Sequence, residues 1–206
     1  MVIAEPLSRG YPPIVGCTIG PWGTVTTSGI YVRLGDRYAF MFGPSNAHTG
    51  YGVVRFGGHT QAHETALECA LREVTEEADI EVTLSTPAAT FYMASADAIP
   101  SLVAAAECRE VRPLLVSGGS LSAPHSVTFI GRTSRAPRPS METQGIILLS
   151  GDEIRRICES DVELGQLVSA GARIIERSKL DRQQRLVPHL QLKFLNWALQ
   201  HGVVGE

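Results

Sequence analysis

Three glutamates, Glu73, Glu76 and Glu77, stand at spacings that bring their carboxylates together on one surface of a helix. Like charges at these spacings repel one another and would destabilise an ordinary surface helix by roughly a few tenths of a kcal/mol per pair. A divalent cation removes this repulsion, and Mg²⁺ is commonly held by a few carboxylates together with substrate phosphates. The spacing therefore favours a Mg²⁺ (or Mn²⁺) site. A solvated acidic helix face is the alternative that the glutamates alone leave open.

The segment that carries these glutamates also has an apolar side. At about 100° per residue, one narrow stripe of the helix contains Leu67, Ala70, Leu71, Val74 and Ala78. The three carboxylates fall roughly opposite this stripe. We therefore expect the helix to pack through its apolar stripe and to present the acids on the other side.

Two glycines, Gly57 and Gly58, follow a short predicted strand at residues 51–56 and lead towards the helix. Glycine permits positive φ and lets the backbone approach a ligand closely. Five residues separate Gly58 from Glu64, and seven separate Glu64 from Arg72. The expected order is strand, tight glycine loop and helix.

Arg72 is expected to brace the acidic cluster from one side. It follows Glu68 by four residues and precedes Glu76 by four residues, so both carboxylates are within reach on a helix.

Together these residues resemble the Nudix box. That pattern is Gly, five residues, Glu, seven residues, Arg-Glu-apolar, one residue, Glu-Glu, one residue and Gly-apolar. Every specified position matches between Gly58 and Ile80 except the last glycine, which is Asp79 here. Because Asp is tolerated at a left-handed helix exit, we expect an intact loop with modest strain.

The resemblance implies roles for particular residues. It makes the three helix glutamates metal ligands, gives a further ligand to the carbonyl of Gly57 or Gly58, and has Glu64 support the site from one turn into the helix. It also implies an acidic residue just before a late strand, as metal ligand or base, and Glu142 fits that place best; the alternative is a plain loop carboxylate. The expected catalytic set is Glu64, Arg72, Glu73, Glu76, Glu77 and Glu142. The expected metal set is Gly58, Glu73, Glu76, Glu77 and Glu142.

The activity that the resemblance implies is metal-dependent hydrolysis of a pyrophosphate bond in a nucleoside diphosphate linked to another moiety. Arg55 and Arg138 are candidates to bind its phosphates, and Tyr51 is a candidate to stack a ring, although solvated arginines and core packing are the plainer interpretations. The alternative function is a Nudix-fold module that senses a nucleotide without turnover. A metal-independent structural domain is a third interpretation.

Composition sets limits on the class of protein. The chain has 206 residues, is 44% hydrophobic and carries a net charge of −3, which suits one core and gives no basic surplus for nucleic acid. Its four cysteines form no CxxC pair, so we expect reduced thiols and a cytoplasmic protein. No apolar run is long enough to predict a membrane span. The expected partner is a small-molecule nucleotide-type substrate.

The fold that the resemblance implies is an α/β/α sandwich with a mixed sheet. We expect an irregular arm at 1–20 and one domain at 21–206, ending in a helical extension at about 152–203. The last helix is apolar enough to be compatible with a homodimer. A helical composition is also seen at 95–110. The predicted strands lie at 24–34, 37–43, 51–56, 80–84, 89–93, 113–116, 126–133 and 145–150.

Overall fold

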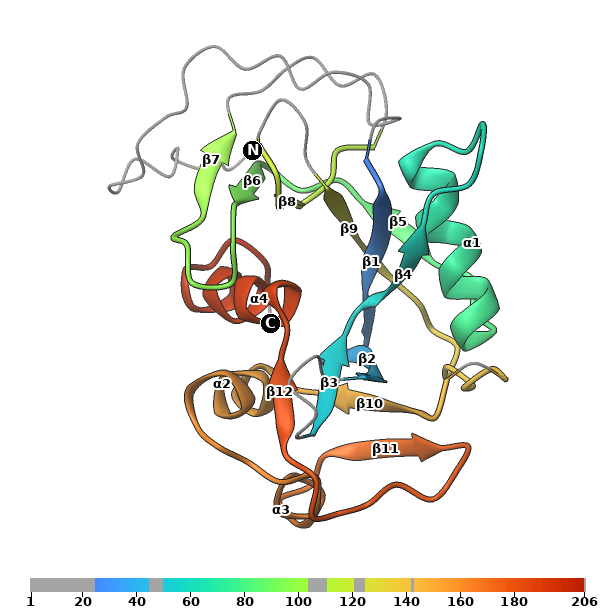
Figure 1. Cartoon of the computed structure of the whole chain (residues 1–206), viewed down its shortest axis with the longest axis vertical. Helices are drawn as coiled ribbons and strands as arrows, with labels where there is room; N and C mark the ends of the chain where they lie inside the picture. Colours follow the sequence, from blue (N-terminus) through green and yellow to red (C-terminus); the bar gives the residue numbers. More distant parts are fainter. Residues whose placement is uncertain (1–24, 45–49, 104–110, 121–124, 142, 206) are drawn as a thin grey trace.

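The computed structural model describes residues 25–44, 50–103, 111–120, 125–141 and 143–205 (Figure 1). Within these ranges the chain forms one mixed sheet and four helices. The strands are β1 (Thr27–Leu34), β2 (Arg37–Pro44), β3 (Tyr51–Val54), β4 (Phe56–His59), β5 (Thr83–Ser85), β6 (Thr90–Met93), β7 (Ser101–Val103), β8 (Leu115–Ser117), β9 (Ser126–Arg132), β10 (Gly145–Leu149), β11 (Arg173–Glu176) and β12 (Leu186–Pro188). The helices are α1 (Ala66–Ala78), α2 (Gly151–Glu159), α3 (Leu164–Ser169) and α4 (Leu190–Gln200).

The longest path through the sheet has the order β11-β10-β2-β1-β9-β8-β6-β7. β1 pairs with β2 as the predicted hairpin, and the two-residue turn between them has Gly35 at φ 64°. β1 also pairs in parallel with β9 and antiparallel with β4. The combination of parallel and antiparallel pairs confirms the predicted mixed sheet.

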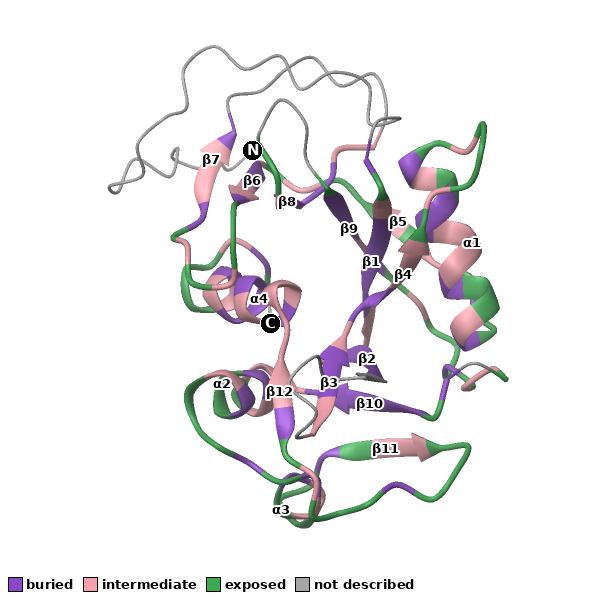
Figure 2. Cartoon of the chain, in the orientation of Figure 1, coloured by how far each residue is buried: buried purple, intermediate pink, exposed green. Residues whose placement is uncertain are grey.

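Alternation along the central strands divides the core between the two faces of the sheet. In β1, Ile30 and Val32 point into one apolar cluster, and Tyr31 points into the other. Successive side chains of a strand point to opposite faces, so a strand that is apolar at nearly every position must be covered on both sides. Figure 2 shows β1, β9 and β10 as mainly buried.

Helices cover both faces. α1 packs on β1, β4 and β9, while α2 and α4 pack together on the opposite side of the sheet, where they contact β12 (Figure 1). This arrangement confirms the α/β/α layering. None of the helices in the described ranges has both the length and the apolar content to span a membrane.

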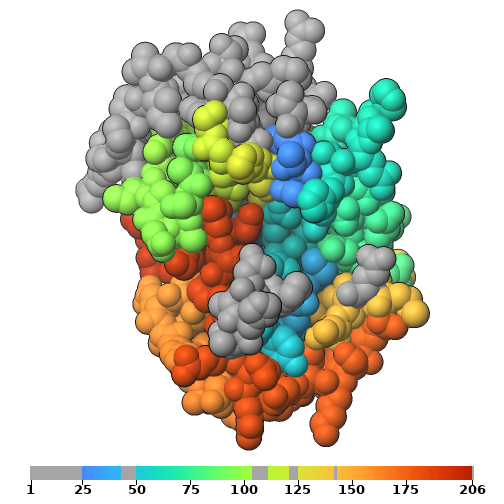
Figure 3. All heavy atoms as spheres, in the orientation of Figure 1, coloured from blue at the N-terminus to red at the C-terminus, as the bar shows by residue number. Residues whose placement is uncertain are grey.

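α4 closes the second face with an aromatic cluster. Phe194 is fully buried, and its ring lies 6.0 Å from that of Phe91 and 5.7 Å from that of Trp197. The Tyr31 hydroxyl donates to the carbonyl of Gln191 at 2.7 Å and ties β1 to the helix. In Figure 3 the red C-terminal residues lie against the light green residues of β6 and β7. On the same helix Ala198 is also buried, and Leu190 and Trp197 are partly buried.

Two predicted helical regions are wrong in part. The C-terminal extension contains β11 and β12 between its helices; β11 pairs with β10, and β12 pairs in parallel with β3. The β-branched pair Ile174-Ile175 fits the pleated edge of the sheet better than a helix. In the region predicted to be helical at 95–110, residues 101–103 form β7 against β6. The predicted N-terminal arm at 1–20 lies outside the described residues.

Candidate active site

The two glycines lie in a strand and not in a loop, which corrects the prediction. Gly57 and Gly58 belong to β4 and face Gly29 and Ser28 of β1. Gly57 has φ 148°, a value that L side chains rarely adopt, and Gly58 presents its vacant side-chain position to α1. The sheet therefore fixes the backbone on which the acidic helix rests.

α1 begins after Glu64, so the expectation that Glu64 lies one turn inside the helix is wrong. Thr65 is the N-cap, and its hydroxyl accepts the Glu68 backbone N–H while the Glu68 carboxylate accepts the Thr65 backbone N–H. This reciprocal capping box uses Glu68 and removes it from reach of the arginine. Glu64 instead accepts the backbone N–H of Gln61 in the connection before the helix.

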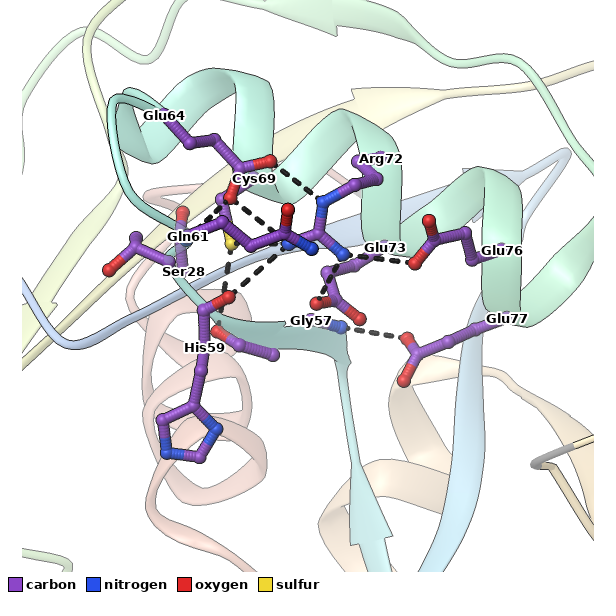
Figure 4. A network of polar contacts seen from close by, with 12 residues as sticks. Ser28, Gly57, His59, Gln61, Glu64, Cys69, Arg72, Glu73, Glu76 and Glu77 are labelled. Atoms are coloured by element: carbon purple, nitrogen blue, oxygen red, sulfur yellow. Dashed lines mark hydrogen bonds and ion pairs between the residues drawn. The ribbon is translucent and has the colours of Figure 1, made fainter.

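Arg72 binds three carboxylates at once (Figure 4). Its Nε and Nη2 atoms donate to the two oxygens of Glu64 at 2.7 and 3.0 Å. Its Nη1 donates to Glu73 at 2.8 Å and to Glu76 at 2.9 Å. The expected bracing by Arg72 is therefore present, with Glu64 in the place that Glu68 was expected to take. A planar guanidinium suits this work because its donors are held in a rigid fork.

The ion pair between Arg72 and Glu64 shifts the pKa values of both of these residues. Hydrogen bonds from Arg72 lower the pKa of Glu64 to about 2, with a smaller contribution from the Gln61 backbone N–H. The hydrogen bonds to Glu64, ahead of those to Glu73 and Glu76, raise the pKa of Arg72. Glu64 is thus ionised near neutral pH and holds Arg72 in its cationic form, fixed towards the other two acids.

The helix glutamates divide between two environments. Glu73 packs against Gly58, where an added Cβ would lie 2.3 Å from a Glu73 oxygen. Glu77 accepts the backbone N–H of Gly57 at 2.9 Å. The Glu76 side chain is 58% exposed, compared with 15% for Glu73. The acids are therefore gathered at the seam between α1 and β4, and only Glu76 faces mainly outward.

The buried face of α1 is rotated towards this seam relative to the predicted stripe. Ala70, Val74 and Ala78 are buried as expected, but Leu67 and Leu71 are only partly buried. Small residues replace them in the interface, because the helix lies close to a strand that contains two glycines. The fully buried residues on this face are Ala66, Cys69, Ala70, Val74 and Ala78.

α1 ends as predicted at Asp79. This residue adopts the left-handed conformation, with φ 52° and ψ 42°, and its N–H donates to the Thr75 carbonyl. The loop that follows β9 then returns to the helix end: the Ser140 N–H and the Thr143 hydroxyl both donate to the Glu77 carbonyl. Glu142 itself lies outside the described residues, so its role as ligand or base stays a prediction.

The three predicted substrate-binding residues lie in different places. Arg55 is buried and donates only to internal partners, so we do not retain a direct contact with substrate. The Tyr51 hydroxyl accepts the backbone N–H of Asp181, and its ring lies 5.5 Å from that of Phe42, as expected for core packing. The Arg138 side chain is exposed, and its backbone N–H donates to the Ala78 carbonyl.

The donors at the seam suit a hard divalent cation by type, because they are carboxylates on one helix surface. In the described part of the chain, no group of three or more His, Cys, Asp or Glu side chains is close enough to hold a metal ion. Arg72 donates to Glu76, and the Gly57 N–H donates to Glu77. The Gly58 carbonyl accepts a contact of 3.7 Å from the Cys69 thiol. Metal binding by either glycine carbonyl stays a prediction.

No family model matches this chain, and no curated protein matches it. Solved structures do resemble it. A NUDIX-family hydrolase from Clostridium perfringens has a TM-score of 0.47 and 16% identity, and the match covers 70% of this chain and 91% of that one. The MutT protein from Methanosarcina mazei Go1 has a TM-score of 0.40 and 16% identity over 63% of this chain and 79% of that one. A C. elegans Ap4A hydrolase has a TM-score of 0.38 and 14% identity over 61% and 80%.

Several of the solved structures that resemble this chain are therefore Nudix hydrolases.

Proposed function

We propose that this chain is a divalent-metal-dependent hydrolase of the Nudix type. Its substrate would be a nucleoside diphosphate linked to another moiety, and the bond broken would be the pyrophosphate bond. The observation that carries this proposal is the way Arg72 joins Glu64, Glu73 and Glu76 beside the glycine strand. A plain solvated acidic face does not need an arginine that is shared by three carboxylates.

Each residue has a distinct task in this proposal. Glu73, Glu76 and Glu77 would hold the cation, and Arg72 keeps the first two of them in fixed positions before the reaction. Glu64 holds Arg72 through two hydrogen bonds. Such preorganisation matters because the site then needs little rearrangement as charge develops in the transition state.

Hydrolysis of a pyrophosphate requires water to attack a crowded, negatively charged phosphorus. A bound divalent cation would neutralise phosphate charge and lower the pKa of a bound water. A carboxylate must accept the proton that the attacking water loses, and Glu142 remains our prediction for that base. The oxygen of the water then joins the attacked phosphorus, the bond from this phosphorus to the bridging oxygen breaks, and the other half of the substrate leaves as a phosphate ester.

The proposal is tested by incubating the protein with a panel of nucleotides, nucleotide sugars and dinucleoside polyphosphates, with Mg²⁺ or Mn²⁺. Product is measured as phosphate released by an added phosphatase. We expect metal-dependent release from at least one compound and none after addition of a chelator. Tight nucleotide binding without any product would instead indicate a sensor.

Two glutamates of α1 offer a matched pair of variants. Glu76→Gln removes a proposed metal ligand on the exposed side of the helix, and we expect it to reduce kcat by about 100-fold or more. Glu68→Gln changes an exposed glutamate in the capping box, where Gln is also accepted, so activity should stay near wild type. Wild-type turnover by Glu76→Gln, or an equal loss in both variants, would contradict the assignment.

A further inference from the structure

An open cleft of about 520 Å³ lies where β5 begins and β9 ends. Residues 81–83 form one wall of the cleft, and residues 132–135 form the other. The described residues that line it include none of the glutamates of α1. Small-molecule sites in proteins usually measure about 300–1,000 Å³, so this cleft has room for a small ligand outside the candidate active site.

Backbone hydrogen bonds fix both walls of the cleft. Arg132 of β9 pairs with Thr83 of β5 in the antiparallel ladder. The Thr133 N–H donates to the Arg33 carbonyl at 2.9 Å, and the Arg135 N–H donates to the Thr133 hydroxyl at 3.2 Å. Because this hydroxyl accepts a hydrogen bond, its own hydrogen is left for a ligand. The cleft is therefore formed before any ligand binds.

Two arginines without carboxylate partners stand side by side at this end of the sheet. Arg33 of β1 and Arg132 of β9 are opposite each other in the parallel pair. Arg33 donates to two neutral acceptors, the carbonyls of Gly35 and Gly205. Arg132 is exposed, and its guanidinium has no hydrogen-bond or ion-pair partner within the part of the chain that the structure describes. Its donors are therefore open to a ligand in the cleft.

The remaining charged side chains at the cleft leave an excess of positive charge. Arg135 pairs with Asp79 at 3.4 Å, and both side chains are more than half exposed. Such an exposed pair contributes little, so the guanidinium can turn towards a ligand at small cost. Glu81 is the other acid beside the cleft. Arg33, Arg132 and Arg135 thus outnumber the two carboxylates by one charge.

The donors of the cleft match a phosphate group better than a carboxylate. Arginine forks bind either group, but Arg132 stands here with the hydroxyls of Thr83, Thr133 and Ser134, which together offer more donors than two carboxylate oxygens can accept. The Glu81 carboxylate repels a bare anion but can accept a hydrogen bond from a ligand hydroxyl. We propose that the cleft binds a phosphate monoester of a polyhydroxy compound, namely a sugar phosphate. The phosphate lies on Arg132, and the sugar hydroxyls lie towards Glu81.

This inference needs neither a metal ion nor turnover, so it does not depend on the proposed function. The test is an amide NMR titration of the metal-free protein with ribose 5-phosphate. We expect saturable shifts in residues 81–83 and 132–135, with a Kd of about 1 mM or below. Ribose lacks the phosphate and should bind at least about tenfold more weakly, and inorganic phosphate lacks the hydroxyls and should bind about threefold more weakly.

Three variants separate the roles of the side chains. Arg132→Gln is a change at an exposed position and should weaken ribose 5-phosphate binding by at least about tenfold. Arg173→Gln is the matched control, because Arg173 is an exposed arginine on β11, away from the cleft, and its loss should leave the affinity unchanged. Glu81→Ala should remove the advantage of ribose 5-phosphate over inorganic phosphate.

An Arg132→Gln variant that binds ribose 5-phosphate as tightly as wild type would overturn the inference, and so would shifts confined to other parts of the chain. An equal loss in Arg173→Gln would show a response to net charge alone and would also overturn it. If Glu81→Ala keeps the full advantage of ribose 5-phosphate, the sugar phosphate is the wrong ligand class. A wild-type protein without hydrolase activity would refute the proposed function and leave the binding result at this cleft unchanged.

Discussion

Gly58 decides where the carboxylate of Glu73 lies, because an added Cβ would meet both of its oxygens and its Cδ within 2.8 Å. The backbone of Gly58 is not in the left-handed region, and the obstructing atoms are the end of a flexible side chain. We expect Gly58→Ala to change the free energy of unfolding by less than about 1 kcal/mol. It should nevertheless displace Glu73 and weaken Mn²⁺ binding, as measured by titration of the folded variant.

Gly57→Ala is the matched comparison. Gly57 has φ 148°, and its added Cβ would lie 2.3 Å from the Ser28 carbonyl oxygen, which is backbone. This variant should lose about 1–3 kcal/mol of stability. Equal stability of the two alanine variants in urea denaturation would contradict the conformations assigned to the two glycines.

Glu64 links folding stability to pH. Its pKa in the folded protein lies near 2, below the ordinary value of 4.5, chiefly because Arg72 donates to it. The ionised form is therefore favoured by folding, and the stability that this contributes is complete above about pH 5 and is lost as the pH falls through 4.5 towards 2. Urea denaturation of wild type and Glu64→Gln should show a difference at pH 6 that shrinks steadily below pH 5. A difference that is constant from pH 6 to pH 2.5 would contradict the assignment.

At the scale of elements, the end of α1 departs from the Nudix pattern at one residue without losing the left-handed exit. Asp79 adopts φ 52°, which costs a side chain more than it costs glycine, and its ion pair with Arg135 is exposed and 3.4 Å long. We expect Asp79→Gly to raise the free energy of unfolding by about 0.5–1 kcal/mol and Asp79→Ala to lower it by a similar amount. The order Gly, Asp, Ala in urea midpoints checks this, and a less stable glycine variant would contradict it.

The sequence predicted some elements near the candidate site and not others. The hairpin of β1 and β2 and the helix exit at Asp79 depend on local signals, namely apolar alternation, turn residues and tolerance of positive φ. β4 could not be predicted in the same way, because a pair of glycines reads as a turn until its partner strand is known. Gly29 supplies that partner, and it lies 28 residues earlier in the chain than Gly57.

At the scale of the whole molecule, long-range contacts decided what the sequence left open. Spacing along one helix was enough to predict that Glu73, Glu76 and Glu77 share one helix surface. The hydrogen bonds between Arg72 and Glu64 could not be predicted, because they depend on how the chain enters the helix. The sequence made Arg55 a candidate to bind a substrate phosphate. It does not show that the Ser126 and Thr128 hydroxyls of β9 accept hydrogen bonds from its guanidinium. β11 and β12 likewise form as strands because they pair with β10 and β3, respectively.

The C-terminal part of the chain supports the sheet face opposite the candidate site. Phe194 is fully buried, and its ring packs with those of Phe91 of β6 and Trp197 of α4, which also contact each other. We expect Phe194→Ala to lower the free energy of unfolding by about 3–5 kcal/mol, since it leaves a cavity and loses aromatic contacts. Gln200→Ala, at an exposed position of the same helix, removes an exposed hydrogen bond to Glu159 and should lower it by no more than about 1 kcal/mol. Urea denaturation checks both values.

Mn²⁺ affinity of the folded fraction should be unchanged in both α4 variants, because α4 packs on the face of the sheet away from α1. If Phe194→Ala weakens Mn²⁺ binding while the protein stays folded, the two faces are coupled through the sheet and the helix does more than stabilise the fold. If it costs less than about 1 kcal/mol, the aromatic cluster is not the contact that holds α4 in place.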